Sequence, residues 1–380
     1  MAKEEKKAPK LRFNGYTNDW ERKELNNILK INSGRDYKQL NSGSIPVYGT
    51  GGYMLSVNDK LSDTDAVGIG RKGTIDKPLY LKAPFWTVDT LFYCTSKENS
   101  DVKFIYLLFQ IINWKRYDES TGVPSLSKNT ISSIKTYVPK VKEQDHISKL
   151  FFSLDNTLQL HERKCEELTL IKKALLQKLF PKKDVIKPEV RYKNFNDAWE
   201  QRRFKDISKL SQGLQIAISK RFTHPGDGKL FYITNEFLNP NSTVKYYIDS
   251  PTKNVIAEKT DILMTRTGNT GKVVTDVEGV YHNNFFKISY NSSKIDRWFL
   301  YYLLNSYPIQ REILVRAGNS TIPDLNHNDF YGIKIYIPTI EEQIKIGTFL
   351  TKVDSLIALH QYKLKKLKQL KKFLLQNMFI

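Results

Sequence analysis

Ile134-Lys135-Thr136-Tyr137-Val138-Pro139 is a short hydrophobic run that ends in proline. The chain repeats it 199 residues later (333 minus 134) as Ile333-Lys334-Ile335-Tyr336-Ile337-Pro338. A Glu-Gln pair follows each run, Glu143-Gln144 in the first and Glu342-Gln343 in the second, and the offset of 199 then holds to the end of the chain. Self-similarity of this length indicates a tandem duplication in which each copy forms one structural unit.

Upstream of these runs the two copies also match, but with smaller offsets. Trp20 corresponds to Trp199 at an offset of 179, and Arg71 corresponds to Arg266 at an offset of 195. The second copy has therefore gained about twenty residues, all in its front part. Short Val-, Ile- and Tyr-containing runs bounded by Gly and Asn, such as residues 44–48 and 261–264, predict strands and loops there. One helix is expected in each front part, at residues 103–114 and 295–305.

Behind each proline the sequence predicts one helix of about forty residues, with a heptad repeat of apolar residues. His161 and His360 interrupt the two repeats at the same place, and we expect them to set the register of the helices rather than to bind metal. Pro181 ends the first helix and begins a short basic connector. Two such helices in one chain can pair as a coiled coil. Its expected core residues are Ile147, Leu154, Leu158, Leu168, Leu175, Ile346, Val353, Ile357, Leu367 and Leu374.

Composition narrows the range of partners. The chain has 60 Lys and Arg against 40 Asp and Glu, a formal net charge of +20, which favours a polyanion, either nucleic acid or an anionic membrane surface. Its two cysteines, Cys94 and Cys165, exclude a disulfide scaffold and a zinc site built from cysteines, and they fit a reducing cytoplasm. The sequence contains no apolar run long enough to span a membrane and no secretion signal.

Motifs of catalysis are not apparent. Residues 68–73 satisfy G-x-G-x-x-G, but the β-branched and proline-containing residues 74–80 follow instead of a helix, which argues against dinucleotide binding. Residues 268–273 are too short for a P-loop, and His282-Asn283-Asn284 has no second histidine nearby. These observations favour a binding protein over an enzyme. The lysine-rich run at 363–372 is interpreted equally well as a solvated helix face or as a stripe that faces phosphate or a partner.

These motifs, in the same order twice over, resemble the specificity subunit of type I restriction-modification enzymes over essentially the full length of the chain. The motifs that carry the resemblance are Trp20 and Trp199, residues 33–38 and 46–52, residues 266–271, residues 320–325, and the two Pro-x-x-x-Glu-Gln helix starts at Pro139 and Pro338.

The resemblance implies an α/β (α+β) fold with two globular mixed β-sheet target-recognition domains, separated by a two-helix antiparallel coiled coil in a pseudo-twofold tandem repeat. Each domain would read one half of a bipartite double-stranded DNA target. The expected boundaries are residues 1–139 for the first domain, 140–180 for the first long helix, 181–189 for the linker, 190–338 for the second domain and 339–380 for the second long helix.

The resemblance also implies a non-catalytic chain in the cytoplasm. It would dock two methyltransferase subunits and, through the complex, motor-nuclease restriction subunits; AdoMet, ATP and Mg²⁺ would belong to those partners, and this chain would bind no cofactor or metal. Arg71 and Arg266 would act on different half-sites. A stand-alone DNA-binding regulator would share the charge and the repeat but would not need the two long helices. The expected DNA-binding residues are Gly34, Arg35, Tyr37, Lys38, Arg71, Lys72, Gly213, Gln215, Arg266, Thr267, Asn269, Lys272 and Asn283.

Overall fold

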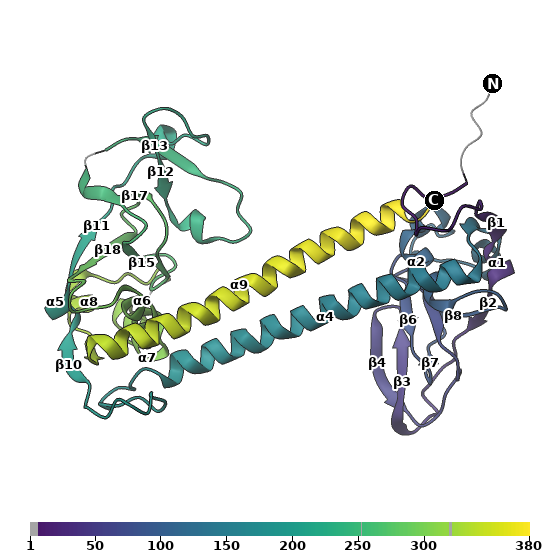
Figure 1. The fold of residues 1–380 in the computed structure, drawn as a ribbon, viewed down its shortest axis with the longest axis horizontal. Coiled ribbons are helices and arrows are strands. Elements are labelled where there is room, and N and C mark those ends of the chain that lie inside the picture. Colours follow the sequence, from purple (N-terminus) through teal and green to yellow (C-terminus); the bar gives the residue numbers. More distant parts are fainter. Residues whose placement is uncertain (1–6, 252, 319–320) are drawn as a thin grey trace. The chain divides into compact units, whose positions relative to one another are not determined.

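The computed structural model describes residues 7–251, 253–318 and 321–380, and the chain divides into two compact units (Figure 1). Unit 1 comprises the chain up to Glu162 together with Tyr362–Ile380, and unit 2 comprises Arg163–Gln361. The division falls within both long helices, α4 (Val141–Lys178) and α9 (Ile340–Asn377). Each unit therefore contains one globular part, the start of one long helix and the end of the other.

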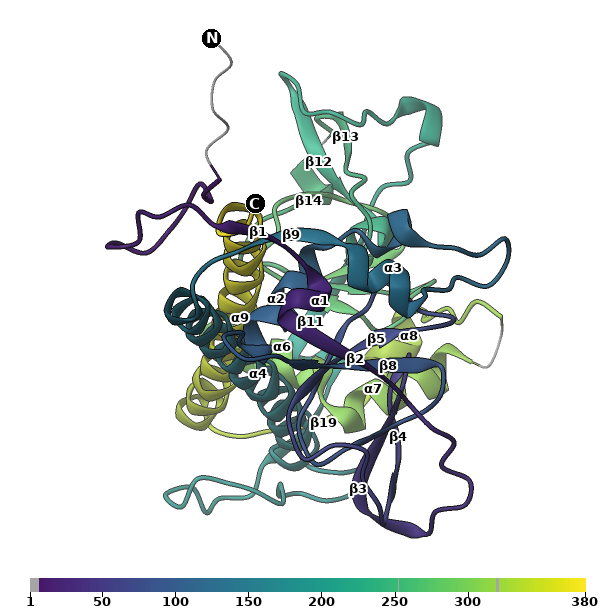
Figure 2. The ribbon, with the colours of Figure 1, turned by 90° about the vertical axis from the view of Figure 1, so that its right-hand side faces the viewer.

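Unit 1 contains three small sheets. An antiparallel pair, β1 with β9, precedes a four-stranded sheet in the order β2-β8-β5-β6 and a three-stranded sheet in the order β4-β3-β7, in which β3 and β7 are parallel. The β3–β4 hairpin is visible in Figure 2. The strands are β1 (Glu21–Glu24), β2 (Leu29–Ser33), β3 (Ser42–Gly49), β4 (Gly52–Val57), β5 (Ala66–Gly70), β6 (Leu79–Leu81), β7 (Trp86–Thr87), β8 (Leu91–Ser96) and β9 (Lys135–Val138).

Unit 2 repeats this arrangement. Its sheets are the pair β10-β19, a four-stranded sheet in the order β11-β18-β15-β16, and a sheet in the order β13-β12-β17-β14, in which β12 and β17 are parallel. The strands are β10 (Glu200–Arg203), β11 (Ser208–Gln212), β12 (Lys229–Ile233), β13 (Tyr246–Asp249), β14 (Ile256–Ala257), β15 (Ile262–Thr265), β16 (Val273–Val274), β17 (Gly279–Tyr281), β18 (Phe285–Tyr290) and β19 (Lys334–Ile337). The predicted tandem repeat is confirmed.

The short helices follow the same repeat with one exception. The expected helices are present as α2 (Val102–Ile111) and α6 (Arg297–Asn305), each capped by an aspartate side chain. The exception is α7 (Tyr307–Ala317), which the sequence analysis missed. Its proline, Pro308, lies in the first turn, where the missing N–H is not needed, so it is compatible with the start of this helix. The remaining helices are α1 (Leu25–Ile28), α3 (Lys128–Ser133), α5 (Phe204–Ile207) and α8 (His327–Tyr331), with 3₁₀ turns at Trp114–Tyr117, Ile218–Lys220, Asn235–Leu238 and Lys253–Val255.

The two long helices pair antiparallel within each unit. In unit 1, Asp155 and Glu162 of α4 form ion pairs with Lys371 and Lys368 of α9, so the partner number falls as the α4 number rises. In unit 2, Lys172 pairs with Asp354. All ten expected coiled-coil core residues are buried or half-buried, as a heptad seam requires. The lysine run at 363–372 thus uses two of its lysines in pairing the helices.

The Glu-Gln motif explains how each long helix is attached to its globular part. In unit 1 the buried Glu143 carboxylate accepts two hydrogen bonds from Arg12, at 2.6 and 2.8 Å. The Gln144 side chain donates to the carbonyl of Pro139 and accepts from the amide of Asp101, the residue that caps α2. Unit 2 repeats both contacts.

There, Arg191 donates twice to Glu342, both times at 2.8 Å. The Gln343 side chain donates to the carbonyl of Pro338 and accepts from the amide of Asp296. These ties place the long helices firmly against the cores. Among the residues that the structure describes, none of the helices combines the length and the apolar character that a membrane crossing needs.

Candidate nucleic-acid interface

The loop after β5 presents Arg71 on the surface of unit 1. The Arg71 amide donates to the carbonyl of Thr90 at 2.8 Å, and the Arg71 carbonyl accepts from the amide of Leu126 at 2.9 Å. Lys72 forms a β-bridge with Ser125. The backbone is therefore held between two other segments while the side chains of Arg71 and Lys72 stay exposed to solvent.

An open hollow of about 520 Å³ lies beside this loop. Its floor includes Phe92, whose ring centre lies 6.0 Å from the Arg71 guanidinium carbon and 5.8 Å from the Lys128 ammonium nitrogen. Lys72 and the carboxylate of Glu119 complete its charged lining. Within the described part of the chain the Arg71 guanidinium forms no ion pair, so three cations face one carboxylate here, an arrangement suited to an anionic ligand. Lys128 was missed by the sequence analysis, because it lies far from Arg71 along the chain.

In the glycine loop at residues 34–38, two residues pack inside unit 1 and the other three are exposed to solvent. A Cβ on Gly34 would lie 2.0 Å from the carbonyl oxygen of Val88, so this position requires glycine for close backbone packing. Tyr37 packs against a small cluster that includes Val47. Arg35 and Lys38 are exposed and available to a ligand.

The tip of the β3–β4 hairpin lies next to the Arg71 loop. The hydroxyl of Thr50 lies 3.7 Å from where a Cβ on Gly73 would be. Tyr53 and Met54, just after the tip, are 63% and 49% exposed, which is high for large apolar side chains. The sequence offered one signal for them, an aromatic residue directly after a Gly-Gly turn.

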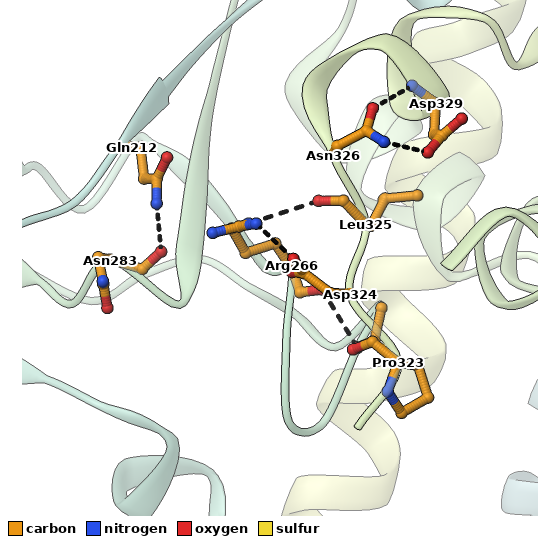
Figure 3. Close-up of polar contacts among 9 residues, drawn as sticks. Gln212, Arg266, Asn283, Pro323, Asp324, Leu325, Asn326 and Asp329 are labelled. Carbon is orange, nitrogen blue, oxygen red and sulfur yellow. Dashed lines mark hydrogen bonds and ion pairs between the residues drawn. The ribbon is translucent and has the colours of Figure 1, made fainter. Parts of the chain in front are cut away.

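In unit 2 the equivalent arginine, Arg266, is held by its own chain (Figure 3). Its Nη2 donates to Asp324 Oδ2 at 2.7 Å, its amide donates to the carbonyl of Asn284 at 2.7 Å, and its carbonyl accepts from the amide of Leu325 at 2.9 Å. The guanidinium carbon also lies 5.7 Å from the centre of the Phe286 ring. Arg266 thus connects the loop after β15 to the loop before α8.

The other expected residues of the Arg266 loop shape the turn. Asn235 donates to the carbonyl of Thr267 at 3.2 Å, and Thr270 donates to the carbonyl of Pro323 at 2.6 Å. Asn269 is exposed and accepts from the amide of Lys272, whose side chain is also exposed. Pro323, Asp324 and Leu325 of the motif at 320–325 contact this loop, whereas Ser320 lies outside the described residues.

Gln215 and Asn283 meet in a second polar group of unit 2. The Asn283 side-chain nitrogen donates to Gln215 Oε1 at 2.9 Å, and Gln212 donates to the Asn283 carbonyl at 3.1 Å. Gly213 is required for packing, because a Cβ there would lie 2.1 Å from the carbonyl oxygen of Tyr281. His282 has a structural contact: its Nδ1 accepts from the amide of Asn284. Burial lowers the pKa of His282, and Arg221 lowers it further.

The glycine pattern at 68–73 does not begin a nucleotide fold. β5 ends at Gly70, and the next element is β6, a strand. Within residues 7–251, 253–318 and 321–380, no cluster of three or more His, Cys, Asp or Glu side chains is arranged to hold a metal ion.

Comparison with known proteins gives one consistent result. A family model, the type I restriction modification DNA specificity domain, matches residues 17–170 and 196–369. The chain is 25% identical over 280 residues to the type I restriction enzyme MjaVIII specificity subunit of Methanocaldococcus jannaschii, covering 68% of this chain and 64% of that protein. It is also 25% identical over 283 residues to the putative MjaX specificity subunit of the same organism, covering 70% and 65%. The chain therefore spans just under two thirds of the length of these relatives.

A solved structure shows the same fold. The crystal structure of the S subunit of a type I restriction-modification system from M. genitalium superposes with a TM-score of 0.70 at 16% identity. The match covers 98% of this chain and 99% of that one. The expected fold class, two mixed-sheet domains in a tandem repeat, is confirmed by this likeness.

Proposed function

Because the chain belongs to the family of the type I restriction modification DNA specificity domain, we propose that it is the DNA-recognition subunit of a type I restriction-modification complex. Each unit reads one half of a bipartite double-stranded DNA target. The chain itself performs no catalysis. It binds two methyltransferase subunits and, through them, the motor-nuclease subunits of the complex.

The duplication of the loop surface carries this proposal. Each unit presents an arginine loop, after β5 in unit 1 and after β15 in unit 2, beside a glycine loop on an equivalent four-stranded sheet. Reading two half-sites requires two such surfaces in one chain, and the net charge of +20 favours a polyanion as the ligand. AdoMet, ATP and Mg²⁺ then belong to the partner subunits.

The long helices favour this function over that of a stand-alone DNA-binding regulator. Each helix starts with a buried Glu-Gln pair tied to one globular part and ends in the core of the other unit. A regulator would need only the globular parts, whereas a subunit that positions two enzymes needs a shared scaffold.

A domain exchange tests the proposal. The full chain is co-expressed with a cognate methyltransferase subunit, and methylation of the host genome is mapped by sequencing. Replacing residues 190–338 with the equivalent domain of another family member should change one half of the methylated sequence and leave the other half intact. Methylation by the purified chain alone, or a change in both halves in an active complex, would contradict the proposal.

A further inference from the structure

The two arginine loops have the same geometry but different charge. In unit 1 the Phe92 ring lies beside Arg71 and Lys128; in unit 2 the Phe286 ring lies beside Arg266 and His327, whose ring centre is 4.7 Å away. The two backbones also match. The bridge between Lys72 and Ser125 in unit 1 has its counterpart in the bridge between Thr267 and Asp324 in unit 2.

The side chains at these equivalent positions differ in charge. Lys72 corresponds to Thr267, Lys128 to His327, and Ser125 to Asp324. The last exchange matters most, because Asp324 holds the Arg266 guanidinium in an ion pair at 2.7 Å while Ser125 offers no charge to Arg71. Arg266 consequently keeps only 21% of its side chain exposed.

We infer that the hollow at Arg71 binds one phosphate of the DNA backbone, whereas the equivalent place in unit 2 binds none, because Asp324 neutralises Arg266. The Arg71 hollow has three cations, and its single carboxylate, Glu119, accepts hydrogen bonds from the hydroxyls of Ser127 and Thr130. At the equivalent place in unit 2, the described residues pair the Arg266 guanidinium with the Asp324 carboxylate. Arg266 is then a positioning residue that holds the loop at 321–325, and the two half-sites are bound by different contacts.

This inference rests on the proposed function and adds to it an asymmetry between two equivalent loops. Their equivalent positions in the repeat predict equivalent roles for Arg71 and Arg266 on different half-sites. A phosphate contact at Arg71 contributes affinity without sequence preference, whereas a base contact would contribute discrimination.

Exchanging the residues that differ provides the test. Binding of the full chain to a labelled random-sequence DNA duplex is measured over a series of salt concentrations. Each phosphate contact contributes about 0.9 to the slope of log affinity against log salt, or about eightfold in affinity at ~0.1 M salt. This slope is negative, and Arg71→Ala should therefore make its magnitude smaller by about 0.9. Ser125→Asp, which copies unit 2 into unit 1, should do the same, and the double variant should show no further loss.

The opposite exchange tests unit 2. Arg266→Ala should leave the slope unchanged. Asp324→Ser should make the magnitude of the slope larger by up to about 0.9, because this change frees the Arg266 guanidinium beside the DNA. Ser153→Asp adds the same charge on the exposed side of α4 in unit 1 and should leave the slope unchanged. Melting temperatures establish that each variant is folded.

The outcomes separate the two proposals. If the unaltered chain fails to bind duplex DNA, both the proposed function and this inference are wrong. If it binds, but Arg71→Ala and Ser125→Asp bind with the same slope as the unaltered chain, only the inference is overturned. When the measurement is repeated on duplexes of defined sequence, a loss for Arg71→Ala that is confined to one of them would make Arg71 a base contact and would likewise overturn the inference.

Discussion

Replacing Glu143 by alanine should destabilise unit 1 by about 3–4 kcal/mol. Its carboxylate accepts two hydrogen bonds from Arg12, at 2.6 and 2.8 Å, and lies 3.4 Å from the indole nitrogen of Trp20. Hydrogen bonds to charged groups contribute about 1.5–3 kcal/mol each. We take the lower part of the combined range, because the Arg12 side chain is 13% exposed and water can partly solvate the guanidinium that is left behind.

The assay is chemical denaturation of the full chain, combined with hydrogen exchange to localise the effect. Amides near the start of α4 and in the segment around Arg12 should exchange faster in Glu143→Ala, while amides of unit 2 should not change. Glu342→Ala provides the matched control, since it removes the equivalent bidentate pair with Arg191 and should act on unit 2.

A second variant distinguishes the unpaired charge from simple loss of packing. The double change of Arg12 to Met and Glu143 to Leu removes both charges and keeps most of the volume, so it should recover most of the lost stability. A loss below about 1 kcal/mol in Glu143→Ala, or a double variant as unstable as the single one, would refute the reasoning.

Three further predictions concern single positions. Gly34→Ala and Gly213→Ala should each lower the free energy of unfolding by about 1–3 kcal/mol, because the new methyl group would meet a carbonyl oxygen. Gly51→Ala, which has open space around it, should have little effect in the same denaturation assay. In the native protein iodoacetamide should modify Cys165 and spare Cys94, because burial raises the pKa of the Cys94 thiol to about 12; fast labelling of both thiols before denaturation would contradict this. The stability of unit 2 should fall as the pH drops below about 6.5, because the pKa of His282 is lowered in the folded state and the unfolded chain takes up the proton first. In thermal melts, His282→Asn should flatten this pH dependence. An unchanged dependence would show that His282 does not cause it.

The tandem repeat and the two long helices could be predicted from the sequence because both are patterns along the chain. A run such as residues 134–139 can be compared directly with residues 333–338, and a heptad repeat reports which face of a helix is buried before any partner is known. The two short helices expected at residues 103–114 and 295–305 could be predicted for the same reason, because apolar periodicity is also a local pattern along the chain. The helix α7 (Tyr307–Ala317) was not predicted, and its apolar periodicity is weak.

Tertiary structure alone decided what the individual polar residues do. Glu143 and Gln144 appeared only as a motif, and their partners Arg12 and Asp101 lie far away along the chain. Arg71 and Arg266 are equivalent in sequence, yet one stays exposed while the other is held by Asp324. The environment of a charged side chain depends on which distant residues the fold brings within a few ångströms of it. Periodicity and repeats along a single sequence carry no information about those distances.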